Sequence, residues 1–192
     1  MAAYTTIDDA GAYYSTHLYT GSGSTNAITG VGFQPDFTWL KYRSGVSTQT
    51  QQTSTIGDNY LSSNNVDGLT AAPNWDSFDS DGFTISGTNT NYNGSGYAYA
   101  SWNWLAGTTS GITTDGSTTI TPTSYTFNQA AGFSMVNYTG NSTSGALVAH
   151  GLGATPHTIF VKNLDSSTDW QVYHKNMDGT SPEDYYMVWN DG

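Results

Sequence analysis

The chain has 192 residues and a formal net charge of −11, with 15 acidic and 4 basic side chains and no cysteine. This charge argues against a nucleic-acid partner, since binding to a phosphate backbone depends on Lys and Arg. The lack of cysteine excludes disulfides, thiol catalysis and zinc–thiolate sites. No apolar run approaches the roughly 20 residues that a membrane-spanning helix needs, so no membrane span is expected.

The composition and the predicted elements favour an all-β protein. The chain contains 30 Thr, 22 Ser and 22 Gly but only 1 Glu, 3 Lys and 8 Leu, so good helix formers are scarce. Asp-Gly and Asn-Gly turns separate short segments with alternating polarity, which predict strands at residues 36–41, 82–85, 97–104, 133–138, 158–162, 170–174 and 185–189. Many short strands with Gly-rich turns are typical of a β-sandwich, here of the jelly-roll or lectin-like kind.

An internal repeat is the most informative pattern in the sequence. Small residues, a proline and an apolar strand face keep their order in two places along the chain. The matching segments are 14–21 with 133–140, a shift of 119; 30–41 with 151–162, a shift of 121; and, more loosely, 58–61 with 184–187, a shift of 126. The repeat predicts two tandem β-sandwiches.

The repeat also predicts how the chain is divided. We expect an N-terminal arm at residues 1–12, a first sandwich at 13–107, a Thr/Ser/Gly-rich junction at 108–131, and a second, truncated sandwich at 132–192. The first copy continues through strands 82–85 and 97–104, whose counterparts the second copy lacks. We therefore expect open core faces and sheet edges in the second copy. The missing strands would come from a longer chain or from a neighbouring molecule.

The acidic loop at residues 76–82 is the best candidate for a metal site. Asp76, Asp79 and Asp81 lie close together in the sequence just before a glycine, which resembles the start of a Ca²⁺ loop. No Glu follows at the usual distal spacing, so a hairpin turn with solvated carboxylates is the favoured alternative.

No pattern in the sequence predicts an enzyme. The four histidines have no metal-ligand spacing, and Glu183 is the only Glu, so a pair of glycosidase carboxylates is not evident. No GxSxG elbow is found for a serine hydrolase. We therefore expect neither catalytic residues nor a resident cofactor other than Ca²⁺ at the acidic loop.

Aromatic side chains are the candidates for ligand binding, because Trp and Tyr rings stack on sugar faces. The candidates near turn residues are Trp75, Tyr92, Tyr97, Tyr99 and Trp170. The alternative is that they fill the core, since so few Leu are present to do so. Trp39, Trp102 and Trp104 are the tryptophans expected in the core.

An ordered set of segments carries a resemblance to a known family. The segments are residues 1–9, 34–41, 80–84, 100–107 and 150–156. Together they resemble a repeated β domain in virion structural proteins of marine tailed phages, described as tail-fibre-like or decoration proteins. The resemblance implies location in a virion and a structural or host-attachment role without catalytic residues. Residues 42–57 depart from the pattern, because a Thr/Gln-rich run stands where a more aromatic or basic segment is expected.

The function predicted is therefore that of a tail-fibre or appendage domain that supports attachment to a host surface. The alternatives are a head-decoration protein that stabilises a capsid and a stand-alone lectin module. The expected partners are other virion proteins, further copies of the chain (a trimer in a fibre) and a host-surface glycan. Repeated modules would make weak single-site binding avid.

Overall fold

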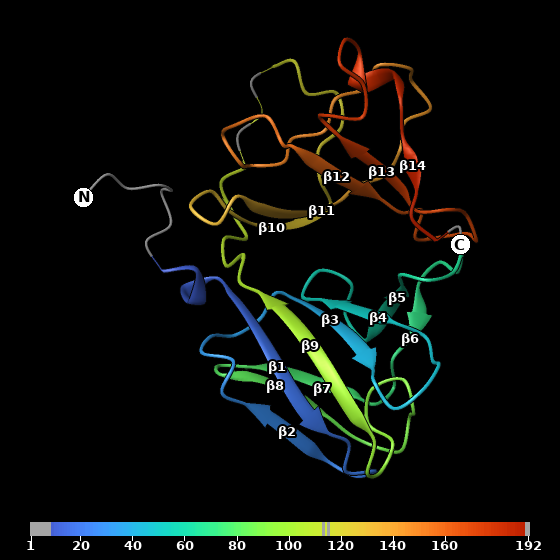
Figure 1. Cartoon of the computed structure of the whole chain (residues 1–192). Coiled ribbons are helices and arrows are strands. Elements are labelled where there is room, and N and C mark those ends of the chain that lie inside the picture. Colours follow the sequence, from blue (N-terminus) through green and yellow to red (C-terminus); the bar gives the residue numbers. More distant parts are fainter. Residues whose placement is uncertain (1–8, 113, 115, 191–192) are drawn as a thin grey trace.

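The computed structural model describes residues 9–112, 114 and 116–190, and its strands form four antiparallel sheets. The prediction of an all-β, sandwich-like fold is confirmed. The helical elements of the described residues are two three-residue 3₁₀ turns, η1 (Ala10–Ala12) and η2 (Pro182–Asp184). No helix in this part of the chain is long and apolar enough to cross a membrane. Residues 1–8 of the predicted N-terminal arm lie outside the described residues. Figure 1 shows two stacked units, a first from blue to green and a second from yellow to red.

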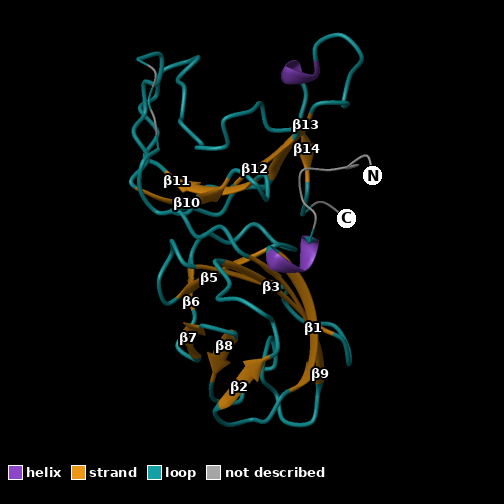
Figure 2. Ribbon diagram, turned by 90° about the vertical axis from the view of Figure 1, so that its left-hand side faces the viewer, coloured by secondary structure: helices purple, strands orange, loops and turns teal. Residues whose placement is uncertain are grey.

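The first unit is a sandwich of a six-stranded and a three-stranded sheet. The three-stranded sheet lies on the concave side of the larger one (Figure 2). In sheet order, the larger sheet contains β1 (Tyr14–Thr20), β9 (Ala98–Trp104), β3 (Phe37–Tyr42), β4 (Thr50–Thr53), β5 (Asn59–Ser62) and β6 (Thr70–Ala71). The smaller sheet contains β2 (Asn26–Thr29), β8 (Gly82–Ile85) and β7 (Trp75–Asp79).

Aromatic and aliphatic side chains fill the space between these two sheets. The Trp75 and Phe83 rings stack with their centroids 4.9 Å apart, and Leu40 and Ile85 are fully buried in the same cluster. Because Leu40 belongs to the larger sheet and the other three to the smaller one, the cluster joins the two layers. Burial of such side chains is the main favourable term in folding.

The second unit consists of a hairpin and a small three-stranded sheet. The hairpin pairs β10 (Ser124–Asn128) with β11 (Phe133–Asn137), so the end of the predicted junction at 108–131 belongs to this unit. The sheet has the order β12 (Thr158–Val161), β13 (Gln171–His174) and β14 (Met187–Val188). All four residues of β12 are exposed. The described residues therefore do not close a second sandwich, and the tandem repeat stays a prediction at this level.

Aromatic rings on the outer face of the large sheet hold the second unit. Trp39 lies 5.5 Å from Trp189, and Trp104 stacks on Phe133 at 5.9 Å, both measured between ring centroids. The expectation that Trp39, Trp102 and Trp104 lie in the core is wrong, because all three are only half-buried. Successive side chains of a strand point to opposite faces of the sheet, and Thr38 and Leu40 point into the core. The three tryptophans therefore lie on the other face, where the units meet.

Trp170 of the second unit forms a further part of the contact between the units. Its ring is buried with Ile56 and Leu61 of the first unit, and its Nε1 donates a hydrogen bond of 2.7 Å to the carbonyl oxygen of Ser62. The amide N–H of Leu69 also donates to the carbonyl of Leu164 at 2.9 Å. A Cβ on Gly68 would lie 2.6 Å from that carbonyl oxygen, so this close approach requires glycine.

Polar side chains cross the same contact. The Asn137 amide Nδ2 donates to the carbonyl of Thr55 at 2.8 Å. The Lys162 Nζ donates to the carbonyls of Val66 at 3.0 Å and of Thr168 at 2.8 Å. Burial lowers the pKa of Lys162, since desolvation disfavours its charged form. The two units are therefore joined by directional bonds as well as by ring packing.

The predicted strands are present, although only Met187–Val188 of the segment 185–189 is strand. One buried polar strand was not predicted from the sequence. β4 lies in the Thr/Gln-rich region that departs from the expected pattern, and all four of its residues are buried. Within the described part of the chain, neither the Thr50 hydroxyl nor either amide atom of Gln52 has a hydrogen-bond partner. Their neighbour Thr38 does have one, because its hydroxyl donates to Asn103 Oδ1 at 3.0 Å. A buried amide without a partner destabilises the fold.

We predict that Gln52→Met increases the free energy of unfolding by about 1–3 kcal/mol, because methionine fills a similar volume without a buried unpaired amide. Chemical denaturation monitored by tryptophan fluorescence measures the change. The matched control is Thr38→Val on the neighbouring strand, which removes a bonded hydroxyl and should cost about 1 kcal/mol. A loss of stability in Gln52→Met would contradict the prediction.

Candidate functional site

The segment 76–82 predicted as a metal loop is a β-hairpin, the favoured alternative: Asp76 and Asp79 lie in β7, and Ser80 and Asp81 form the turn to β8. Gly82 ends the turn at φ 148°, and a Cβ there would collide with the carbonyl oxygen of Ile28. Only glycine can therefore stand at this position. The structure brings the smaller sheet's edge strands, β2 and β7, together around β8 at this point.

The three carboxylates of this loop bind separate groups of the protein. Asp76 accepts a hydrogen bond from Ser86 Oγ at 2.8 Å. Asp79 accepts from Ser77 Oγ and from Thr84 Oγ1, each at 2.6 Å. Asp76 and Asp79 thus each have their own hydroxyl donors, and these contacts hold the hairpin.

Asp81 bridges the hairpin to the loop that follows β2. Its two carboxylate oxygens accept hydrogen bonds from the amide N–H groups of Gly30, at 2.9 Å, and Gly32, at 2.7 Å. These two bonds lower the pKa of Asp81 below its ordinary value of 3.8, because they stabilise the charged form. Gly30 and Gly32 both have positive φ, so the sequence Gly-Val-Gly supplies this anion-binding turn.

No three His, Asp or Glu side chains of the described residues are grouped so that they could hold a metal ion. Asp76, Asp79 and Asp81 in particular do not converge on one point in the hydrogen-bond pattern given above. A Ca²⁺ site at this loop stays a prediction.

Four of the five aromatic residues proposed for ligand binding lie in the interior. Tyr92 and Tyr99 are 0% exposed, Trp75 is 6% exposed and Trp170 is 7% exposed. A ring without an exposed face has no surface on which a sugar could stack. Tyr97, at 41% exposed, is the one of the five that presents its ring to solvent.

The interior tyrosines have structural contacts instead. The Tyr99 hydroxyl accepts a hydrogen bond from the Gly94 N–H at 2.8 Å and donates to the Thr90 carbonyl at 2.9 Å. Its ring stacks on Tyr19 with the centroids 5.1 Å apart. Burial raises the pKa of Tyr99 and Tyr19, because the charged phenolate would be desolvated.

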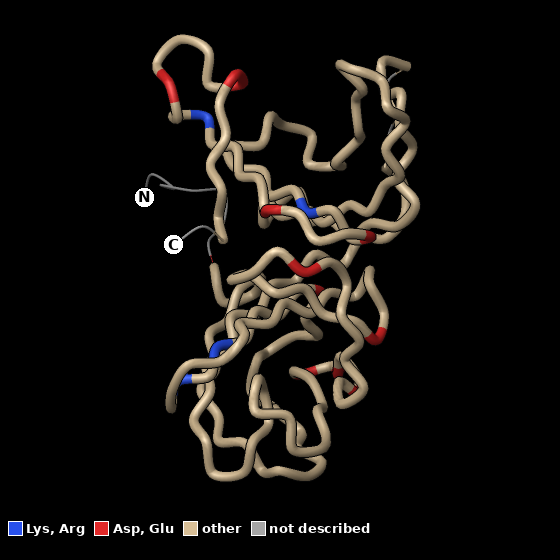
Figure 3. Tube along the Cα trace, turned by 90° about the vertical axis from the view of Figure 1, so that its right-hand side faces the viewer, with Lys and Arg blue, Asp and Glu red and all other residues tan. Residues whose placement is uncertain are grey.

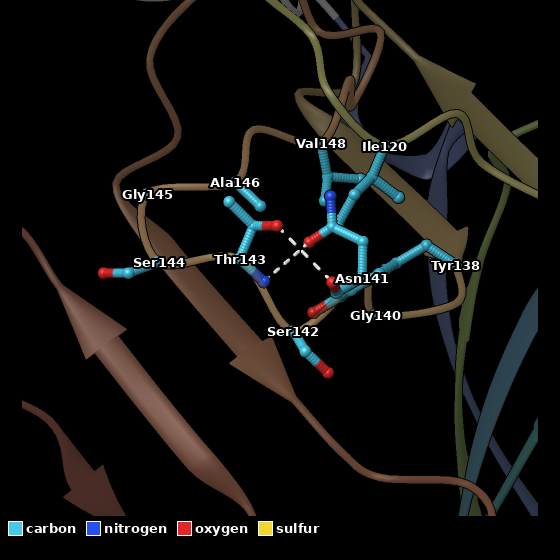
Figure 4. A pocket seen from close by; sticks show the side chains of 10 residues that line it. All are labelled: Ile120, Tyr138, Gly140, Asn141, Ser142, Thr143, Ser144, Gly145, Ala146 and Val148. Carbon is cyan, nitrogen blue, oxygen red and sulfur yellow. Dashed lines mark hydrogen bonds between the residues drawn. The ribbon is translucent and has the colours of Figure 1, made fainter.

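The surface of the described residues includes two hollows of a size to hold a small ligand. One, of about 400 Å³, lies in the second unit between Tyr138, Ile120 and the loop 140–146 (Figure 4). Its polar groups partly bind each other, since the Thr143 N–H donates to Asn141 Oδ1 at 3.0 Å. The other, of about 560 Å³, lies between the units, and its carboxylate, Asp36, already accepts bonds from Ser54 Oγ and the Ala106 and Gly107 N–H groups.

The most prominent exposed feature is an apolar surface on the second unit. One member lies in β12 and the others lie in β14 or directly beside it, and they are 40–63% exposed. We call them the aromatic edge: Phe160, Tyr185, Tyr186, Met187 and Trp189. Phe160 and Trp189 contact each other with ring centroids 4.9 Å apart. The sequence predicted a strand at residues 185–189 but did not indicate a site there. The signal that could have done so is the unbroken apolar run, because alternate side chains of a strand point to opposite faces and one apolar set can then remain exposed.

The charged side chains are not gathered in one patch. Acidic residues are scattered over both units; of the four cations, Lys41 and Arg43 are neighbours in the first unit, and Lys162 and Lys175 lie apart in the second (Figure 3). This distribution offers no basic surface to a nucleic acid and no concentrated acidic surface to a cation. The aromatic edge is therefore the strongest candidate for a functional surface.

The chain is thus an all-β protein with a closed sandwich, a more open second unit and an exposed aromatic edge. Residues 9–192 match the model of a family described as a domain of unknown function (DUF7483), and the chain belongs to this family. The match spans both units. No curated protein and no solved structure matches the chain.

We predict that Asp81→Asn destabilises the protein at neutral pH, because the folded state loses a carboxylate held by two N–H groups. A lowered pKa in the folded state stabilises the fold above the unfolded value, and this contribution is lost as the pH falls through the folded pKa. The difference in stability between the wild type and the variant should therefore shrink in acid. Urea denaturation from neutral pH to below pH 3.8 measures it.

Asp165→Asn, in an exposed loop of the second unit, is the matched control and should have little effect at any pH. A difference between Asp81→Asn and wild type that stays constant from neutral pH into acid would contradict the role assigned to this carboxylate.

Proposed function

We propose that this protein is a structural β module of a virion appendage, of the tail-fibre type, and that the aromatic edge attaches it to its neighbours in the assembly. The observation that carries the proposal is the exposure of Tyr185, Tyr186 and Met187 next to one another, at 55%, 63% and 53%. Contiguous apolar surface of this kind typically marks an interface between proteins.

The rest of the molecule supports a structural role. Antiparallel sheets with a rigid aromatic core make a firm module, and the stacked units extend it along one direction (Figure 1). The carboxylates of the acidic loop bind hydroxyl and N–H groups of the protein, so they act in folding. The resemblance to virion β domains names the class of assembly in which such a module works.

The experiment is to measure the mass of the purified protein by analytical ultracentrifugation over a range of concentrations. We expect the wild type to form an oligomer, a trimer in the case of a fibre, and the double variant Tyr185→Ser, Tyr186→Ser to be monomeric, because the apolar area that drives association is gone. Circular dichroism should show that the variant keeps its β structure.

The controls are Leu18→Ser and Val46→Ser, which replace apolar side chains that are 58% and 101% exposed on the first unit. Neither should change the mass. A wild type that stays monomeric at the highest concentration would contradict self-association through the aromatic edge. Immunogold labelling of virions then separates the appendage from the alternative of a head-decoration protein, which would label the capsid lattice.

A carbohydrate-binding module is the second candidate. The observation in its favour is Tyr138, 43% exposed at the rim of the hollow bordered by Asn141 and Thr143 (Figure 4). An exposed ring beside amide and hydroxyl groups suits a sugar. On a glycan array, Tyr138→Ala should abolish binding, while Trp75→Ala acts only through stability because Trp75 is buried. An array without any bound glycan would remove this candidate.

A further inference from the structure

The small sheet of the second unit repeats the strand pairing of the first unit. Phe37 pairs with Thr53 in β3–β4, and Thr158 pairs with His174 in β12–β13. From Phe37 to Thr158 and from Thr53 to His174 the distance along the chain is 121 residues in both cases. The other three pairs of β3–β4 are reproduced in β12–β13 at the same spacing.

The next strand continues the correspondence. Gln51 pairs with Leu61 in β4–β5, and Val172 pairs with Met187 in β13–β14. The spacing is 121 residues from Gln51 to Val172 and 126 from Leu61 to Met187, which are the two shifts of the sequence repeat. Because a slip of one residue would turn every side chain to the other face, equal register is a demanding match.

The correspondence identifies which strand the second unit lacks. In the first unit, β9 lies between β1 and β3 and is antiparallel to both. The counterparts of β1 and β3 are β11 and β12. Within the described residues, β11 pairs only with β10 and β12 only with β13. The edges of β11 and β12 that would face a counterpart of β9 therefore have no strand between them.

The same comparison shows which sheet face is open. In the first unit this face is 0–1% exposed and is covered by the sheet β2–β8–β7; its residues are Thr38, Leu40, Thr50, Gln52 and Ser62. Their counterparts in the second unit are Ile159, Val161, Gln171, Tyr173 and Val188, and none of them is buried. Ile159 is 41% and Val161 40% exposed. Three polar side chains that are buried in the first unit, Thr38, Gln52 and Ser62, thus correspond to Ile159, Tyr173 and Val188, which are not buried.

We infer that the second unit binds a β-strand from a protein partner between β11 and β12, antiparallel to β12, as β9 lies beside β3. The inference rests on the proposed function, because it describes how the second unit, which is proposed to attach the protein to its neighbours, would bind a partner. Free strand edges readily accept an added strand through main-chain hydrogen bonds, while side-chain pockets select its sequence.

The residues at the open edge specify the chemistry of the bound strand. In the first unit, Asn103 of β9 stands opposite Thr38, which donates a hydrogen bond to its Oδ1, and Ser101 stands opposite Leu40. In the second unit Ile159 replaces Thr38 and cannot form that bond. The bound strand should therefore carry aliphatic side chains at the two positions that correspond to Ser101 and Asn103. A β9 strand from a second copy would leave its Asn unpaired, at a cost.

The test uses the full chain and synthetic peptides copied from residues 97–106, with lysines added at both ends for solubility. The probe peptide carries Ser101→Val and Asn103→Val. The matched peptides carry either the unchanged residues or a further Trp102→Pro, which blocks strand pairing. Amide hydrogen exchange of the protein, read residue by residue by NMR, reports where each peptide binds.

We expect the probe peptide to slow exchange in both β11 and β12 by about tenfold or more, the unchanged peptide to protect them less, and the proline peptide not at all. Val161→Lys in the protein should abolish protection, whereas Val46→Lys on the first unit should not. Both positions are exposed, so both variants should fold.

Protection by the proline peptide, protection of β14 alone, or no protection by any peptide would overturn the inference. These outcomes differ from a failure of the proposed function, which is read from the mass of the protein and its Tyr185 and Tyr186 variant. A chain that assembles through the aromatic edge but binds no strand would keep the proposed function and remove the strand site.

Discussion

Ring packing on the outer face of the six-stranded sheet is the interaction on which the arrangement of this molecule depends. Strand alternation turns Thr38 and Leu40 into the sandwich core and turns Trp39 outward. The outward Trp39 and Trp104 then meet Trp189 and Phe133 of the second unit. The large sheet is therefore covered on both faces, by its own small sheet inside and by the second unit outside.

This arrangement gives the second unit a buried cluster that it shares with the first. Trp170 is 7% exposed because it packs on Ile56 and Leu61, which belong to the first unit. The first unit thus supplies one wall for the second. The opposite face of the second unit has no such wall, and its Ile159 and Val161 remain in contact with solvent. The surface available for partners follows from this asymmetry.

The location of the exposed aromatic rings decides which side chains are available to bind a partner or a sugar. The rings that the sequence suggested for sugar stacking are mostly interior, where Trp75 stacks on Phe83 and Tyr99 on Tyr19. Three exposed rings, those of Tyr185, Tyr186 and Trp189, lie along 185–189 beside the exposed Met187. The proposal that this protein attaches to a neighbour in an assembly rests on that exposed segment.

The sequence by itself determined the all-β class, the positions of most strands and the hairpin turn at Asp81-Gly82, because strand alternation and turn chemistry are local properties. It also contained the shifts of 121 and 126 residues that the strand registers reproduce. It could not decide which face of Trp39, Trp75 or Trp170 is covered, or that the polar β4 is buried. These depend on which sheet packs on which, and that is settled only when distant segments of the chain come together in the tertiary structure.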